Sequence, residues 1–300
     1  MAPVRMKPLS PSIFKLPTHP HFPFLRLPRE LRDEVYKLVF APISSNSLRP
    51  IRGRDTLPKS LAILHVCRQV NEEAGYVLYS QYIISFDDGG AMRSMFRSLS
   101  SSGVSRFRHI CIGGTPIKSV LINRKPTHDF FAALWTFKRH SLPLSLKTFT
   151  VFDIAADNVS FEIFLDLVKF GNCWKELRYF SPSAAKLGLS RADIGHAKPG
   201  HVSYKLEILN KIMLERDGQN SGASVTIYEA TDPVYKQIWE LCSTTVAGRN
   251  ATATQRWKHE EALLVIARRG YHADISEGAT PPYVFDRRTV GPQKYWLPPP

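Results

Sequence analysis

Cysteine is scarce in this chain, with four residues in 300, and no two of them form a C-x-x-C pair. Thiols so few and so far apart argue against a disulfide framework and give a zinc ion no local pair of ligands. Cys67 lies in a helix-like apolar pattern and Cys111 in a strand-like run. Together with Cys173 and Cys242, we expect them to be buried thiols in a reducing compartment.

Long hydrophobic runs are also missing. No stretch approaches the about 18 uninterrupted apolar residues that favour a membrane-spanning helix. Near Met1, prolines and basic residues interrupt every apolar run, which is unlike a secretory signal peptide. We therefore expect an intracellular protein, cytoplasmic or nuclear, with no membrane partner.

Acidic residues are too few to balance the basic ones: 26 Asp and Glu stand against 40 Lys and Arg, a net charge of +14. Such an excess attracts polyanions. The densest basic loop holds Arg49, Arg52, Arg54 and Lys59, yet no run of five or more Lys and Arg occurs, and aromatic residues are not interleaved with them. Contact with a nucleic-acid phosphate backbone is therefore kept as an alternative function.

Sequence motifs of catalysis are absent as well. The chain has no G-x-S-x-G turn and no H-E-x-x-H helix. The segment Gly113–Ser119 resembles a P-loop superficially, but Ile117 stands where a glycine is required and Pro116 removes a backbone N–H. We expect a non-enzymatic protein with no catalytic residue, no cofactor and no metal ion.

Two amphipathic helices are predicted near the start of the chain. In the first, Pro28 suits an opening helical position, and the apolar residues after it recur on one face until Pro42, which we expect to end the helix. In the second, apolar residues from Leu64 to Leu78 repeat at helical spacing, and Arg68 can pair with Glu72 one turn on. The apolar positions of the first helix are Leu27, Leu31, Val35, Leu38 and Val39.

These helices carry the pattern L-P-x-E-L-R-x-x-[IV]-Y, followed by C-R-Q-[IV]-x-x-E-A and then L-Y. The pattern resembles the opening of a large group of fungal proteins with an F-box-like start, and the match covers residues 24–86. Tyr82 stands where that group usually has Asn. The matching residues are Leu27, Pro28, Glu30, Leu31, Arg32, Val35, Tyr36, Cys67, Arg68, Gln69, Val70, Glu73, Ala74, Leu78 and Tyr79.

The resemblance implies a protein-interaction module, with docking on the Skp-type adaptor of cullin ubiquitin ligases as the function of an F-box. It would place the partner-binding residues on the first helix, at Leu27, Pro28, Leu31, Val35 and Leu38. The residues themselves leave two interpretations open, because an apolar helical stripe is either core or a docking surface.

Beyond residue 87, strand-like and helix-like segments alternate. This order favours an α/β (or α+β) fold, with a largely parallel sheet covered by helices. We expect strands at 107–112, 146–152, 177–180 and 223–228. We expect helices at 91–99, 130–140, 161–170, 205–216, 234–241 and 255–268.

Three of these strands begin with a similar short sequence pattern, which resembles degenerate leucine-rich repeats. The spacing is irregular and the Asn ladder of true repeats is missing, so a short curved α/β layer is favoured over a solenoid. We divide the chain into a flexible proline-rich lead at 1–23, an F-box-like helical segment at 24–86, an α/β body packed with it at 87–280, and a Pro/aromatic tail at 281–300.

Overall fold

The computed structural model describes residues 23–45, 59–86, 88–113, 119–122, 125–128, 144–153, 160–171, 173–189, 204–246 and 261–273. The predicted helix at 130–140, the arginines of the basic loop and the predicted tail at 281–300 lie outside these residues, as does most of the predicted lead. The predictions for those segments therefore stay predictions.

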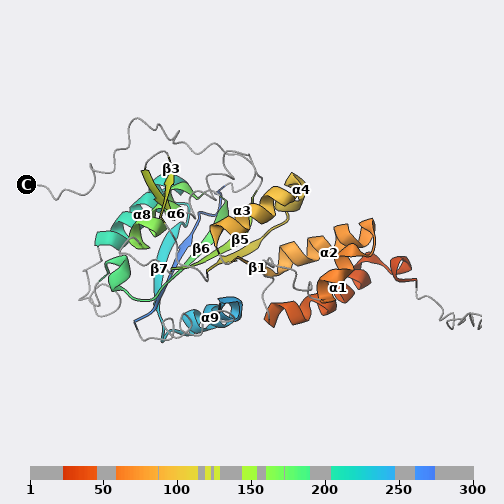
Figure 1. Ribbon diagram of the computed structural model, residues 1–300. Helices are drawn as coiled ribbons and strands as arrows, with labels where there is room; N and C mark the ends of the chain where they lie inside the picture. The colour runs from red at the N-terminus through yellow and green to blue at the C-terminus, as the bar shows by residue number, and fades with distance from the viewer. Residues whose placement is uncertain are drawn as a thin grey trace, which may run out of the picture.

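The described chain forms an α/β fold in which helices and strands alternate after two opening helices (Figure 1). The α-helices are α1 (Arg29–Ser45), α2 (Arg68–Gln81), α3 (Gly89–Ser98), α4 (Ser101–Val104), α6 (Ser160–Phe170), α8 (Tyr204–Asp217) and α9 (Pro233–Val246). Short 3-10 helices are η1 (Phe24–Arg26), η2 (Lys59–His65) and η3 (Ala185–Leu187). The strands are β1 (Ile83–Phe86), β2 (His109–Ile112), β3 (Ser119–Ile122), β4 (Lys125–His128), β5 (Leu146–Phe152), β6 (Trp174–Ser181), β7 (Ser224–Glu229) and β8 (Leu263–Arg268).

The main sheet has six strands in the order β1-β2-β5-β6-β8-β7. Four parallel strands, β1, β2, β5 and β6, are added one after another along the chain, whereas β8 runs antiparallel to both of its neighbours. The sequential parallel order agrees with the expected α/β layer, and β8 makes the sheet mixed. Strands β3 and β4 form a separate antiparallel pair.

Helices cover both faces of the sheet. Crossovers between parallel strands are right-handed, so strands added in one direction place their connecting helices on one face. Figure 1 shows α3, α6 and α8 on one side of the sheet and α9 on the other. The opening helices α1 and α2 lie together beside β1, at the end of the sheet. Their buried side chains Tyr36 and Val77 belong to the same apolar core as Phe149 of β5.

Strand β8 corrects the helix expected at 255–268, of which residues 261–268 are described and 263–268 are a strand. The crossover through α8 carries the chain from β6 past one vacant position to β7, and β8 fills that position. Its alternate residues face both layers: Val265 points to the α8 side and Ile266 to the α9 side. A strand buried on both faces is continuously apolar and has no period of two, so its pattern resembles a buried helix.

Three smaller expectations are also corrected. Helix α1 continues beyond Pro42 to Ser45, so neither the missing N–H of proline nor the crowding of its ring against the preceding turn ends the helix there. Cys67 is exposed, since it is the extended residue before α2 and not part of the helix. Strand β2 begins at His109 rather than 107. In the described part of the chain, no helix is both long and apolar enough to cross a membrane.

The face of the sheet under α9 holds an aromatic cluster. Phe152 of β5 stacks on Phe180 of β6, with ring centroids 4.6 Å apart and planes 3° from parallel. Tyr235 and Trp239 of α9 meet Phe180 edge to face at 5.4 and 5.7 Å. These contacts attach α9 to the sheet, because offset and edge-to-face aromatic pairs contribute beyond the area they bury.

Replacing Phe180 with Ala should therefore lower the free energy of unfolding by about 3–5 kcal/mol, through lost burial and the cavity left behind. The control is Leu241→Ala on α9, whose side chain is exposed and should change stability by less than about 1 kcal/mol. Urea unfolding of both variants measures the difference. Equal losses in the two variants would contradict the packing described.

Candidate docking surface on the first helix

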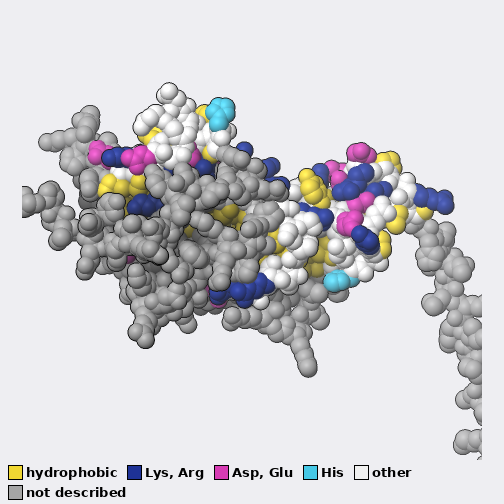
Figure 2. Space-filling model, turned by 90° about the horizontal axis from the view of Figure 1, so that it is seen from above, with side chains coloured by type: hydrophobic (Ala, Val, Ile, Leu, Met, Phe, Trp, Pro, Cys, Tyr) yellow, Lys and Arg dark blue, Asp and Glu magenta, His cyan; other side chains and the backbone are white. Residues whose placement is uncertain are grey.

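The helical pair α1 and α2 forms one end of the molecule. Figure 2 shows hydrophobic side chains reaching the surface there among Lys, Arg, Asp and Glu. This is the part of the chain that carries the F-box-like pattern. How α1 is rotated about its own axis decides which of its side chains reach that surface.

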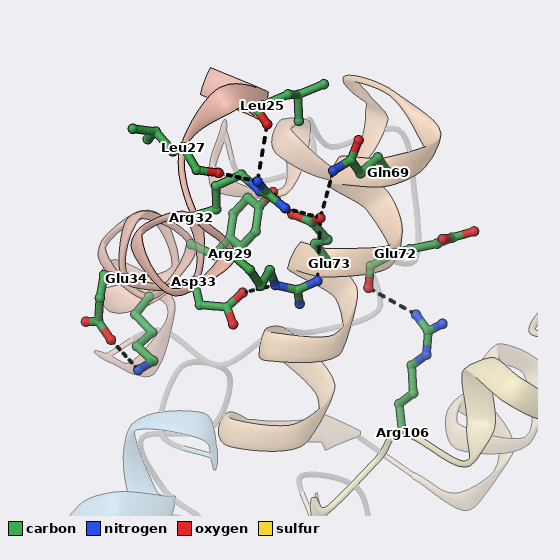
Figure 3. Close-up of polar contacts among 12 residues, drawn as sticks. Leu25, Leu27, Arg29, Arg32, Asp33, Glu34, Gln69, Glu72, Glu73 and Arg106 are labelled. Atoms are coloured by element: carbon green, nitrogen blue, oxygen red, sulfur yellow. Dashed lines mark hydrogen bonds and ion pairs between the residues drawn. The ribbon is translucent and has the colours of Figure 1, made fainter. Parts of the chain in front are cut away.

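The rotation of α1 is set by a buried ion pair with α2 (Figure 3). Arg32 of α1 donates from Nε to Oε2 of Glu73 at 2.8 Å and from Nη2 to Oε1 at 2.7 Å. Both residues are buried, with 8% and 7% of their surface exposed. Two parallel charge-assisted bonds define direction as well as distance, so this face of α1 is held against α2.

Further donors surround the Glu73 carboxylate. Tyr36 donates its hydroxyl to Oε2 at 2.9 Å, Gln69 donates to Oε1 at 3.0 Å, and Arg29 approaches Oε1 at 3.5 Å. The hydrogen bonds from Arg32, with those from Gln69 and Tyr36, lower the pKa of Glu73 to about 2 against the opposing effect of burial. Burial, and then the bond to Glu73, raise the pKa of Tyr36 to about 12.

Arg32 also organises the start of the helix. Its Nη1 donates to the backbone carbonyl oxygens of Leu25 and Leu27, at 3.3 and 2.5 Å. Phe24 packs edge to face on the ring of Tyr36, with centroids 5.7 Å apart. One guanidinium therefore connects η1, α1 and α2, and it uses donors on three nitrogens to do so.

This arrangement leaves the apolar stripe of α1 facing outward. Arg32, Tyr36 and Phe40 recur every four residues and are buried. The leucines on another side of the helix are not: Leu31 is 52% exposed and Leu38 is 73% exposed. These two residues lie two helical turns apart, about 10 Å along the axis. We call them, with the half-buried Leu27 and Val35, the α1 stripe.

The five residues expected to bind a partner therefore differ in exposure. Pro28, just before α1, and Leu31 and Leu38 on it are exposed, while Leu27 and Val35 are half-buried. Two ion pairs of α1 lie near the stripe. Lys37 Nζ is 2.6 Å from Oε1 of Glu34, and Arg29 Nε is 2.6 Å from Oδ1 of Asp33. An apolar strip with a charged rim is the usual composition of a protein-binding patch.

The sequence pattern did not indicate the structural role of its own polar residues. The pattern includes Arg32 and Glu73 without indicating that they meet, yet Arg32 is buried and bonded to Glu73. The available signal was the spacing of Arg32, Tyr36 and Phe40, which places an arginine on an otherwise aromatic helical face. The exposed pair of Arg68 and Glu72 was expected, and the two side chains meet at 3.1 Å.

Tyr82, which replaces the usual Asn of the resembling proteins, has a contact of its own. Its hydroxyl donates to the backbone carbonyl of Lys37 at 3.0 Å, and its ring meets Phe40 edge to face at 5.9 Å. Tyr82 therefore attaches the second half of α1 to the residue that leads into β1. The α1–α2 pair is held at both ends, by Arg32 near its start and by Tyr82 farther along.

Among the described residues, no group of three or more His, Cys, Asp or Glu side chains is placed to hold a metal ion. Arg49, Arg52 and Arg54 of the predicted nucleic-acid contact lie outside those residues. The fourth, Lys59, begins η2. Nucleic-acid binding by this loop therefore stays a prediction.

Replacing Glu73 with Gln should leave the Arg32 guanidinium buried without a countercharge. We expect the free energy of unfolding to fall by about 3 kcal/mol, as for other buried pairs broken on one side. The matched control is Glu72→Gln, one residue earlier, which removes only the exposed pair with Arg68 and should lower stability by less than about 1 kcal/mol. Chemical denaturation compares them, and equal effects would contradict a structural role for Glu73.

The stabilisation by Glu73 should also depend on pH. Its pKa is about 2 in the folded protein and 4.5 ordinarily. Because the carboxyl group has a lower pKa when folded, its ionised form stabilises the folded protein fully at pH values above its ordinary pKa. This stabilisation is lost as the pH falls from about 5 toward about 2. The gap in stability between wild type and Glu73→Gln should therefore narrow from pH 6 to pH 3. A gap that stays constant or widens would contradict the lowered pKa.

No protein-family model, curated protein or solved structure matches this chain.

Proposed function

We propose that this protein is a non-enzymatic interaction module that docks on a protein partner through the α1 stripe. The observation that carries the proposal is the exposure of Leu31 and Leu38 on a helix whose buried side holds an arginine. Exposed leucines are common singly, but here two lie on one face of α1, with the half-buried Val35 between them and the half-buried Leu27 just before the helix.

The partner that we propose is the Skp-type adaptor of a cullin ubiquitin ligase. Support comes from the F-box-like pattern, whose residues Pro28 and Leu31 are exposed, just before and on the first turn of α1. In such a complex, the α/β body would present the surface that recognises the substrate. The fixed rotation of α1 favours binding, because a rigid helix loses little conformational entropy when it docks.

The two exposed leucines can make a large enough contribution to binding to be measured. Full burial of a leucine contributes about 1.5–3 kcal/mol, so the two exposed leucines can contribute about 3 kcal/mol or more. That amount corresponds to a factor of about 100 in the dissociation constant. The two residues are therefore suitable anchors for a test by substitution.

The test is direct binding of the purified protein to a purified Skp-type adaptor, measured by calorimetry. The double variant Leu31→Asp plus Leu38→Asp should bind at least about 100-fold more weakly. Both positions are exposed, so we expect its thermal unfolding to stay close to that of the wild type. The matched control is Leu241→Asp, an exposed leucine on α9, which should bind as the wild type does.

Two outcomes would contradict the proposal. If the wild type does not bind the adaptor, the adaptor role fails. If the folded double variant binds as tightly as the wild type, the α1 stripe is not the docking surface.

A further inference from the structure

A basic groove crosses the sheet at the amino ends of its parallel strands. Its volume is about 520 Å³, and it is lined by six cationic side chains and one carboxylate. The cations come from four elements of the sheet: Arg108 precedes β2, Lys147 is on β5, Lys175 and Arg178 are on β6, and Arg268 and Arg269 are at the end of β8. Although distant in sequence, they meet because β8 runs antiparallel to β6.

The strand register explains why these residues converge. His109, Thr148, Glu176 and Arg268 are successive partners across β2, β5, β6 and β8, so they form one row on the sheet. Arg178, two residues after Glu176, lies on the same face. That face continues into the aromatic cluster of Phe152 and Phe180. Lys147 and Lys175, each one residue before a member of this row, point to the opposite face, so the groove lies across the amino-end edge of the sheet and takes side chains from both faces.

Two of the arginines are held in place by the single carboxylate. Glu176 accepts from Nε of Arg178 at 2.6 Å and from Nε of Arg268 at 2.9 Å. Arg178 has 18% of its side chain exposed and Arg268 has 45%. One negative charge thus restrains two guanidinium groups without neutralising both. Their remaining N–H groups suit the paired oxygens of a phosphate.

The sixth cation, Arg269, has only 8% of its side chain exposed and is paired with Asp217 at 2.8 Å, so the lysines and Arg108 carry the rest of the charge. Lys147 and Lys175 are exposed, and each directly precedes a member of the registered pair Thr148 and Glu176. They are therefore neighbours on adjacent strands about 4.8 Å apart. Within the described chain, neither has a carboxylate in ion-pair contact. Arg108 is held by backbone oxygens of Ser105 and Ser145, at 2.8 and 2.9 Å, and likewise has no acidic partner there.

A histidine at the side of the groove reports the resulting field. His109 lies 2.8 Å from the Thr148 hydroxyl, measured from its Nδ1. Burial lowers the pKa of His109, and the positive charges of Lys147, Arg178 and Arg108 lower it further, to about 4. These three cations lie near enough to act on the imidazole, and a bound anion would oppose their part of the lowering.

We propose that this groove binds a small anion carrying two or more phosphate groups. The cations come from four neighbouring strands, which together span about 14 Å, farther than one phosphate reaches. The volume suits a small ligand. Because the lining includes no aromatic side chain, it provides no surface for stacking bases, which single-stranded nucleic acids use.

The test uses inorganic tripolyphosphate as the probe and calorimetry at about 50 mM salt, where electrostatic binding is strong. Wild type should bind it at one site. The double variant Lys147→Gln plus Lys175→Gln should bind at least tenfold more weakly. The matched control, Lys211→Gln plus Lys236→Gln, removes the same charge from exposed positions on α8 and α9 and should bind as the wild type does.

Nuclear magnetic resonance supplies an independent readout. Saturation with tripolyphosphate should raise the pKa of His109 toward the ordinary value of about 6.5, followed on the resonance that disappears in His109→Gln. An unchanged pKa on saturation would overturn the proposal.

Three binding outcomes would also overturn it. These are the absence of saturable binding, an equal loss in both double variants, and a single-stranded oligonucleotide that binds the groove at least tenfold more tightly than tripolyphosphate. The second would show a diffuse effect of net charge, and the third would make nucleic acid the ligand.

Discussion

The buried pair of Arg32 and Glu73 is the interaction on which the opening helices depend. A charged group removed from water is tolerated only when its partner and its remaining donors are satisfied. Glu73 meets this condition with donors from Arg32, Tyr36 and Gln69, and Arg32 meets it with the carbonyl groups at the start of α1. The geometry of these bonds leaves α1 little freedom to rotate.

This constraint has a consequence for the surface of the helix. A rotation of α1 that buried Leu31 and Leu38 would expose Tyr36 and Phe40 and would separate the ion pair. Burial of the leucines alone offers about 1.5–3 kcal/mol each, and it would be offset by the lost aromatic burial and by two charges left unpaired. The outward stripe is therefore a result of polar bonding between helices, and it gives the molecule an apolar surface without weakening its core.

The sheet contributes a second surface by a different physical route. The parallel strands have their amino ends at one edge of the sheet. Strand β8 is antiparallel to them, so its carboxyl end lies at the same edge. Cations on these four strands therefore lie close together although they are far apart in sequence. The two surfaces are on different parts of the fold, since the α1 stripe lies on the helical pair and the basic groove lies where β2, β5, β6 and β8 meet.

Much of the secondary structure followed from local pattern. Residues 146–152 were expected as a strand and form β5, and the helices expected at 161–170 and 205–216 are α6 and α8 with small changes at their ends. The two helices each have a water-facing side, so their hydrophobicity repeats with the helical period. Strand β5 is buried on both faces over most of its length, but Thr148 and Thr150 alternate there with apolar residues and preserve a strand-like pattern. The segment at 263–268 was misassigned as a helix. It is buried on both faces, so its residues are nearly all apolar and do not alternate with the period of two that identifies a strand.

The sequence by itself determined the α/β class, the helical start and the excess of positive charge, because these follow from composition and short-range periodicity. Only the tertiary structure decided that Arg32 is buried and Leu31 exposed, since the choice depends on Glu73, which lies 41 residues away. The same holds for the basic groove. Its cations are scattered along the chain, and only the strand register, a long-range property of backbone hydrogen bonding, brings them together.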